Sequence, residues 1–223
     1  MNSNPQDATS VKKYGLAFHT ATPELGLAIS NFAGDSRCQT WNLGRSLATD
    51  LHQHLVEFIA PQTWADLAFI AVAKGPGGFT GTRMGMVTAR TLAQQLDIPV
   101  FAISTLAAVA WAQPPQTSEA RGGLLSMALQ MPAQRGQLFG AVYSVNKDSG
   151  LTELFPDTVM TAESWQEKLE SWENSYKLIE VGSELGWSVF SVLELAYLEW
   201  KQGSRPAWSD ALPYYGQHPV QGK

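Results

Sequence analysis

The order of apolar segments along the chain is repeated, and this repetition is the strongest constraint on the fold. In each half, short apolar runs separated by tight turns predict three strands, followed by an amphipathic helix, a strand and a helix. The repeat lies in the order of elements and not in the residues themselves. A doubled unit of this kind predicts two similar lobes with a cleft between them.

The expected elements follow from apolar spacing and turn residues. In the first half we expect strands at 14–18, 25–30, 37–41, 67–73 and 100–103, and helices at 46–60, 83–96 and 105–112. In the second half we expect strands at 124–129, 138–145, 151–155 and 176–181, and helices at 163–173 and 188–202.

A segment rich in Pro, Gln, Ser and Gly separates the two halves and predicts a linker. The domain organisation that we expect is a polar tail at 1–13, an N-terminal lobe at 14–112, the linker at 113–123, a C-terminal lobe at 124–203 and an irregular tail at 204–223.

Composition excludes several classes of protein. The chain has 223 residues, 15 basic and 20 acidic side chains and a net charge of −5, which argues against a stand-alone nucleic-acid binder. Its single cysteine, Cys38, excludes a disulfide scaffold or a cysteine zinc site. Charged residues make up 16% of the chain, and eight tryptophans indicate a large core or a surface that meets another protein. The polar start and the prolines within 98–116 predict a cytoplasmic protein without a membrane span.

A glycine-rich loop between a predicted buried strand and a predicted helix is the strongest local feature. Backbone amides in such a loop, together with the following helix start, can hold an anion. The candidate residues for an anion or nucleotide site are Gly75, Gly77, Gly78, Thr80, Gly81 and Arg83. The alternative is that the glycines serve tight turns and close packing. Arg83, expected in the first helical turn, opposes the helix dipole and suggests an acidic neighbour.

Residues that could carry out chemistry are scarce. The chain has no nucleophile elbow and no zinc-protease motif. His52 and His54 are two residues apart on a predicted helix and cannot share a metal. His19, at the end of the first strand, could face the cleft, although a lone histidine is more often structural. The sequence therefore predicts no catalytic residue and no metal site.

The glycine loop resembles a known family signature. Residues 71–85 resemble the Gly-Pro-Gly-Ser-Phe-Thr-Gly-x-Arg-x-Gly signature of the bacterial TsaB (YeaZ) family, which is glycoprotease-like (peptidase M22-like). Residues 16–22 resemble the opening strand and turn of that family, and 104–108 its Ser-Thr-Leu segment. Beyond residue 112 the match is thin, with Arg135 and following residues and a C-terminal Leu212-Pro213-Tyr214-Tyr215 as the remaining similarities.

The resemblance implies an α/β fold of two ribonuclease-H-like lobes with mixed sheets flanked by helices, as in the actin, Hsp70 and sugar-kinase superfamily. It implies a role in making threonylcarbamoyladenosine in tRNA. In that pathway the paralogue TsaD performs the transfer, the TsaB subunit pairs with TsaD, and the ATPase TsaE joins the complex. Contact with tRNA would then occur only through the complex.

Three departures from the family pattern bear on activity. The aspartate of the opening turn is His19 here, an Asp-Ala-Arg run is replaced by Pro132-Ala133-Gln134, and a glutamate is replaced by Gln137. In the superfamily, the aspartate helps to hold metal and phosphate. The departures weaken a catalytic role and leave a partner role intact.

Two hypotheses of different classes follow. The first is a non-catalytic partner subunit that binds TsaD through apolar helix positions and forms a homodimer when alone. Its interface candidates are Leu51, Leu55, Met84, Met86, Ala89, Leu92 and Ala93. The alternative is an autonomous ATP-binding enzyme, either a phosphotransferase or a glycoprotease-like peptidase. We expect no cofactor beyond weak nucleotide binding by the loop.

Overall fold

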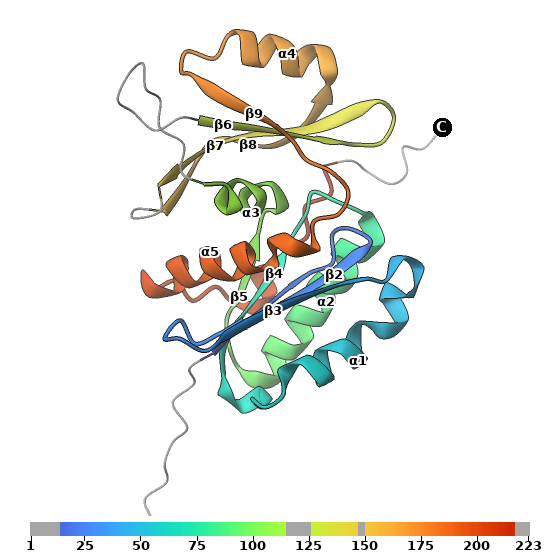
Figure 1. Ribbon diagram of the computed structural model, residues 1–223, viewed down its shortest axis with the longest axis vertical. Coiled ribbons are helices and arrows are strands. Elements are labelled where there is room, and N and C mark those ends of the chain that lie inside the picture. Colours follow the sequence, from blue (N-terminus) through green and yellow to red (C-terminus); the bar gives the residue numbers. More distant parts are fainter. Residues whose placement is uncertain (1–13, 115–125, 147–149, 217–223) are drawn as a thin grey trace, which may run out of the picture.

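The computed structural model describes residues 14–114, 126–146 and 150–216. These form two lobes, each built on one β-sheet (Figure 1). The predicted tail at 1–13 and most of the predicted linker lie outside the described residues. Among the residues described, no helix combines the length and the apolar character that crossing a membrane requires.

The first sheet contains five strands in the order β3-β2-β1-β4-β5. Strand β1 is antiparallel to β2 and parallel to β4, and β4 is parallel to β5. The strand bounds are β1 Tyr14–His19, β2 Glu24–Ser30, β3 Ser36–Asn42, β4 Leu67–Ala73 and β5 Val100–Ile103. All five lie where the apolar runs predict strands.

The second sheet repeats this arrangement with four strands in the order β8-β7-β6-β9. Strand β6 is antiparallel to β7 and parallel to β9, as β1 is to β2 and β4. The bounds are β6 Ser126–Pro132, β7 Gln137–Asn146, β8 Gly150–Thr161 and β9 Tyr176–Glu180. The repeated order confirms the expected pair of mixed-sheet lobes flanked by helices.

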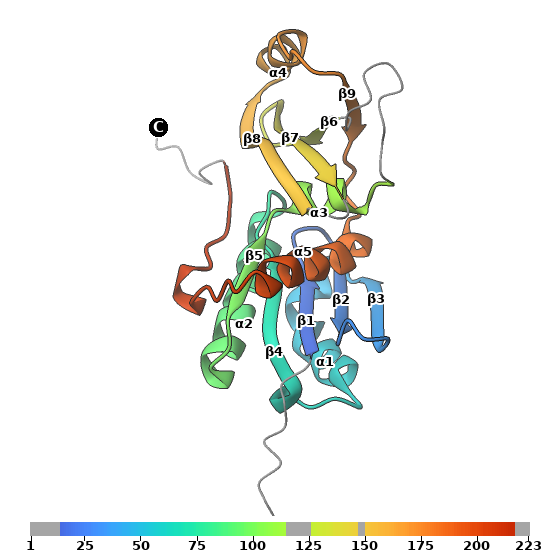
Figure 2. The ribbon, with the colours of Figure 1, turned by 90° about the vertical axis from the view of Figure 1, so that its left-hand side faces the viewer.

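In the part of the chain that the structure describes, five α-helices cover the sheets. They are α1 Leu47–Ile59, α2 Phe79–Leu96, α3 Thr105–Ala112, α4 Ala162–Glu170 and α5 Val189–Lys201. Figures 1 and 2 show the resulting layers: α4, the second sheet, α3, α5, the first sheet, and then α1 with α2. The largest core lies between the two sheets around α3 and α5, a second lies between the first sheet and α1 and α2, and a small one lies under α4.

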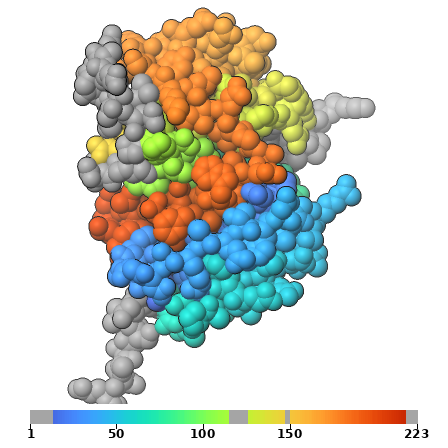
Figure 3. Space-filling view, viewed as in Figure 1, coloured from blue at the N-terminus to red at the C-terminus, as the bar shows by residue number. Residues whose placement is uncertain are grey.

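The last helix of each half packs against the sheet of the other half. Helix α3 follows the first sheet in sequence but packs beneath β6, β7 and β8, whereas α5 lies across β1, β2, β4 and β5. Figure 3 shows the chain after β9, in orange, running over one face from the second lobe down to α5. The sequence predicts that the segment 188–202 belongs to the C-terminal lobe. That prediction is wrong, because the helix in this segment packs on the sheet of the N-terminal lobe. Helix α3 is buried on all sides, so it needs neighbours from both lobes.

Helix α2 begins four residues earlier than predicted. Its first residue is Phe79, with Gly78 as the N-cap. Arg83 is therefore in the second turn and not the first, where the helix-dipole effect is small. Arg83 is also exposed, so the acidic neighbour that its predicted position suggested is not needed.

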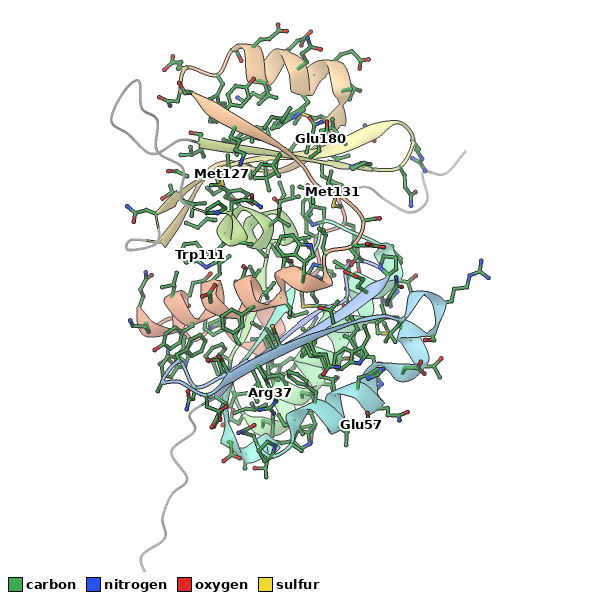
Figure 4. The ribbon with its side chains drawn as sticks, viewed as in Figure 1. Arg37, Glu57, Trp111, Met127, Met131 and Glu180 are labelled. Atoms are coloured by element: carbon green, nitrogen blue, oxygen red, sulfur yellow. The ribbon has the colours of Figure 1, made fainter. Side chains whose placement is uncertain are left out.

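Side chains fix several helix ends. The Ser104 hydroxyl accepts a hydrogen bond from the Ala107 amide and caps α3, as predicted. The Thr161 hydroxyl caps α4 in the same way through the Ser164 amide. At the end of α1, the Arg37 guanidinium donates hydrogen bonds to the last carbonyls of the helix. Arg37 is labelled in Figure 4.

Candidate functional site

A cleft of about 1240 Å³ lies between the two lobes. Its first-lobe wall comes from the turn after β1, the start of α1 and the start of α2, and its second-lobe wall comes from β6, β7 and the segment after β9. These lining residues are Thr20, Ala21, Thr22, Pro23, Gly44, Arg45, Leu47, Ala48, Gly77, Gly78, Phe79, Thr80, Gly81, Met84, Met131, Pro132, Ala133, Gln134, Phe139, Val181, Gly182, Ser183 and Tyr215.

The position of the cleft follows from the topology of the first sheet. Strands β1 and β4 are parallel neighbours, and the connections from their carboxyl ends leave in opposite directions, to β2 on one side and to α2 on the other. A crevice forms at such a reversal point, and ligands of open α/β sheets bind there. The turn after β1 and the glycine loop after β4 therefore share one wall.

Most glycines of the loop permit close packing. A Cβ on Gly77 would overlap the Ala21 carbonyl oxygen, and a Cβ on Gly81 would overlap that of Thr20. The Gly78 amide donates a hydrogen bond to the Ala21 carbonyl (2.7 Å) and is not free for an anion. The second interpretation of the loop, that its glycines serve tight turns and close packing, therefore explains Gly77 and Gly81.

The loop still offers amide groups to the cleft. Thr80 and Gly81 line the cleft at the start of α2, where first-turn amides have no acceptor within the helix. Two of the six predicted loop residues lie elsewhere: Gly75 packs against the chain at Tyr214, and Arg83 is exposed outside the lining. Anion binding by the remaining residues stays a prediction.

The described lining of the cleft carries little charge. Arg45, exposed at the start of the helical segment before α1, is the one charged side chain among the described lining residues. That lining contains no carboxylate, and within residues 14–114, 126–146 and 150–216 no three His, Cys, Asp or Glu side chains are grouped to hold a metal ion. The described lining thus offers no carboxylate, the usual protein ligand of magnesium.

His19 does not face the cleft. It is fully buried at the end of β1, and neither ring nitrogen has a hydrogen-bond partner among the described residues. Burial lowers the pKa of the imidazole to about 4 because the charged form cannot be solvated there. Its register partner on the antiparallel neighbour β2 is Gly26. The suggestion that His19 could line the cleft is therefore wrong.

The second-lobe wall was largely missed by sequence reasoning. Met131, Phe139 and Val181 come from three different strands or their ends and share no local motif. Two signals were present: the departure at Pro132-Ala133-Gln134 falls in this wall, and the C-terminal Pro-x-Tyr similarity ends at Tyr215, which lines the cleft. Figure 4 shows Met131 at the end of the second sheet.

The predicted partner-binding positions are mostly core positions. Among the predicted interface residues, Leu51, Leu55, Met86, Ala89 and Ala93 are buried in the core beneath the first sheet, while Met84 and Leu92 are partly buried. The apolar residues extend around α2 because the sheet covers one side and Trp208 lies against another. The most exposed large apolar side chains of α1 and α2 are instead those of Val56 and Val87, at 61% and 55% of their surface.

Comparisons with known proteins agree on one family. The family model described as TsaD, tRNA N6-adenosine threonylcarbamoyltransferase, matches residues 53–169, somewhat more than half of the chain. The tRNA threonylcarbamoyladenosine biosynthesis protein TsaB of Bacillus subtilis is 39% identical over 116 residues, which cover 50% of this chain and 44% of that protein. TsaB of Escherichia coli is 26% identical over 161 residues, covering 71% of this chain and 66% of that protein.

Solved structures show the same fold. YeaZ from Pseudomonas aeruginosa superposes with a TM-score of 0.70 at 20% identity, covering 91% of this chain and all of that one. The chain spans about half the length of the first curated relatives that it matches. The match to the family model extends from α1 into α4 and includes the glycine loop and part of each wall of the cleft. The chain therefore belongs to the family that this model describes, and within it to the TsaB (YeaZ) proteins.

Proposed function

We propose that this chain is a non-catalytic partner subunit in the synthesis of threonylcarbamoyladenosine in tRNA, and that it pairs with a TsaD-type transferase. The observation that carries the proposal is the chemistry of the cleft. The superfamily's metal-binding aspartate would stand at the end of β1, and this chain has there a buried, neutral His19. The described lining adds no carboxylate to replace it.

The enzyme alternative is not favoured. Phosphoryl transfer relies on charge neutralisation around the phosphates, usually by a metal held through oxygen ligands. A peptidase needs a nucleophile with a base in reach. The hydroxyl side chains of the lining are those of Thr20, Thr22, Thr80, Ser183 and Tyr215. No histidine, aspartate or glutamate of the described residues shares that lining with them.

The surface of α1 and α2 is the proposed docking site for the transferase. Val56 on α1 and Val87 on α2 are both more than half exposed, and the two helices pack side by side on the same face of the first sheet. Half-buried Met84 and Leu92 extend the apolar surface along α2. In isolation the same surface would pair with a second copy of the chain.

The remaining partners follow from this role. We propose that a TsaE-type ATPase and tRNA both reach the chain only within the complex, since the chain is acidic overall. The site of action would be the cytoplasm, where tRNA is modified.

Association with the transferase tests the proposal. The purified chain is mixed with the TsaD-type transferase of the same organism, and the mass in solution is measured by light scattering. We expect a stable complex that Val87→Glu abolishes, because it places a charge in an apolar contact. The matched control is Leu178→Glu on β9, an exposed leucine of the second lobe (43% exposed), which should leave the complex intact.

A cellular measurement completes the test. Depletion of the chain should lower the threonylcarbamoyladenosine content of tRNA, measured by mass spectrometry, and Leu178→Glu should restore that content while Val87→Glu should not. A chain that stays strictly monomeric with the transferase present would contradict the proposal. So would a steady ATPase activity of the isolated chain that His19→Ala abolishes.

A further inference from the structure

The last described residues connect the two lobes at the cleft. Residues 211–216, the strap, begin at Ala211, which is buried in the core beneath the first sheet. The Tyr214 amide donates a hydrogen bond to the Lys74 carbonyl (2.7 Å), and its hydroxyl donates one to the backbone carbonyl of Asp157 (2.6 Å). Lys74 directly follows β4, and Asp157 is on β8. One residue thus links the glycine loop of the first lobe to a strand of the second.

Ring contacts of the strap reach both walls of the cleft. The Tyr214 ring meets Phe139 of the second lobe edge-on, with centroids 6.3 Å apart. The Tyr215 ring lies against Phe79 of the first lobe at 4.6 Å and lines the cleft. Consecutive residues therefore contact opposite lobes, an arrangement that opposes their separation.

Glycines let the strap lie directly on the protein. A Cβ on Gly75, which has φ +100°, would overlap the Tyr214 carbonyl oxygen. A Cβ on Gly216 would lie 2.6 Å from the Phe139 ring. The close packing of the strap on the loop therefore explains why residue 75, which does not line the cleft, is a glycine.

The Asp157 carbonyl, which accepts the hydrogen bond of the Tyr214 hydroxyl, is held in place. The Asp157 carboxylate accepts a hydrogen bond from the Tyr143 hydroxyl (2.8 Å), and that hydroxyl lies 3.3 Å from the capping Ser104 oxygen. Asp157 lies where the register between β7 and β8 shifts. Its carbonyl is therefore not needed for the hydrogen bonds that pair these two strands. It is thus a rigid acceptor for the strap.

The main contact between the lobes is of a kind that can slide. Helix α3 packs on α5, and the core around the two helices includes small residues of α3, among them Ala107, Ala108 and Ala110. Trp111 of α3 donates a hydrogen bond to Glu194 of α5 (2.9 Å). Packed helices of this kind accommodate shear motions between domains. Trp111 of this contact and Met131 of the cleft wall lie at different places between the lobes, as their labels in Figure 4 show. Sliding at α3 and α5 would therefore open the cleft.

We propose that the strap is a latch that holds the cleft at its present opening, with the Tyr214 hydroxyl as the bond that is released when the lobes move apart. Loss of that one hydrogen bond should raise the population with an open cleft about fivefold, the usual net effect of a single neutral hydrogen bond. Loss of the whole side chain should raise it further, because the Phe139 contact is lost as well.

Thiol labelling measures the open population directly. Met131→Cys places a thiol in the cleft wall at a position only 7% exposed, while native Cys38 is exposed and serves as an internal reference. A bulky maleimide reaches position 131 in proportion to the open population. We expect Tyr214→Phe to speed labelling at 131 about fivefold, and Tyr214→Ala more, with the Cys38 rate unchanged. Tyr215→Phe is the matched control, since no hydrogen bond of its hydroxyl is found among the described residues, and should change the rate less than twofold.

A core thiol separates latch release from general loosening. Ala89→Cys introduces a thiol at a fully buried position of the first lobe. Its labelling rate should be the same with Tyr214 or Phe at position 214. Equal acceleration at positions 89 and 131 would overturn the proposal, and so would an unchanged rate at 131 in the Tyr214→Phe variant. Tyr214→Phe removes one oxygen atom and keeps the ring, so this variant decides the question even if Tyr214→Ala does not fold.

Discussion

The Thr20 hydroxyl donates a hydrogen bond to the Gly81 carbonyl (2.8 Å), which ties the end of the first strand to the first turn of α2. The two backbones are so close that a methyl group on Gly81 would overlap the Thr20 carbonyl oxygen. This contact fixes one wall of the cleft. It also shows that a glycine in the signature loop is required by packing.

Gly81→Ala should therefore destabilise the protein. The added methyl meets rigid backbone on the other side of the contact, and overpacking of this kind costs about 1–3 kcal/mol of the free energy of unfolding. Gly78→Ala is the matched control: its φ is −64° and its Cβ would lie 3.6 Å from the Ala21 carbonyl oxygen, an ordinary contact. Urea unfolding of the two variants tests this, and equal stability would contradict it.

Arg37→Ala should weaken the end of α1. The Arg37 guanidinium donates to the carbonyls of Phe58, Ile59 and Ala60 at 2.8–3.0 Å, and its plane lies near the Phe58 ring. These are last-turn carbonyls without an intrahelical donor, and a cation there also favours the helix dipole. We expect a loss of about 1–2 kcal/mol in thermal or urea unfolding. Arg83→Ala removes the same charge from an exposed site on α2 and should leave stability unchanged.

Acid should destabilise the fold through His19. The pKa of the buried imidazole is about 4, against 6.5 for a free histidine, so the unfolded chain binds a proton first as the pH falls. The stability that comes from the neutral ring is complete above pH 6.5 and is lost progressively below it, by about 3 kcal/mol at pH 4. Urea unfolding at a series of pH values measures this loss.

His19→Leu separates that effect from other acid titrations. Both ring nitrogens lack partners among the described residues, so an apolar side chain of similar size gives up no hydrogen bond there. The variant should be nearly as stable as the parent at pH 7 and lose less stability between pH 6.5 and 4. The exposed His52→Gln should keep the parent's pH dependence. An identical acid slope in parent and His19→Leu would show that the imidazole binds its proton equally well in the folded and the unfolded chain, and would contradict this prediction.

The Asp157 carboxyl should lower the stability of the fold at neutral pH, whereas the His19 ring lowers it in acid. Burial raises the pKa of its carboxyl, while hydrogen bonds with Ser104 and Tyr143 and the charge of Lys74 partly offset this. The native state then holds the proton to higher pH than the unfolded chain, so the carboxyl costs stability as the pH rises through that window. Asp157→Asn keeps an oxygen for the Tyr143 hydroxyl and should be more stable than the parent at pH 7. The gain should shrink toward pH 4, and a variant less stable than the parent at pH 7 would contradict this.

Local structure could be derived from the sequence because its causes are local. The continuous apolar run of β4 and the cap at Ser104 predicted their elements to the residue. The repeated order of strands and helices predicted two lobes and a cleft. The glycine loop was located correctly between strand and helix, although Gly78 starts the helix earlier than expected because a glycine N-cap gives no side-chain signal.

The tertiary structure alone decided which surfaces cover one another. An apolar pattern indicates how much of a helix is buried, but it does not indicate which element covers it. For this reason the sequence pattern assigns α5 to the wrong sheet and the buried Met86 to a partner surface. The same holds for the cleft: Phe139 and Tyr215 lie far apart in sequence and line the same cleft only because the strap returns to the glycine loop. His19 could be recognised as a departure from the family, but its burial depends on neighbours that only the packing of α5 and the strands supplies.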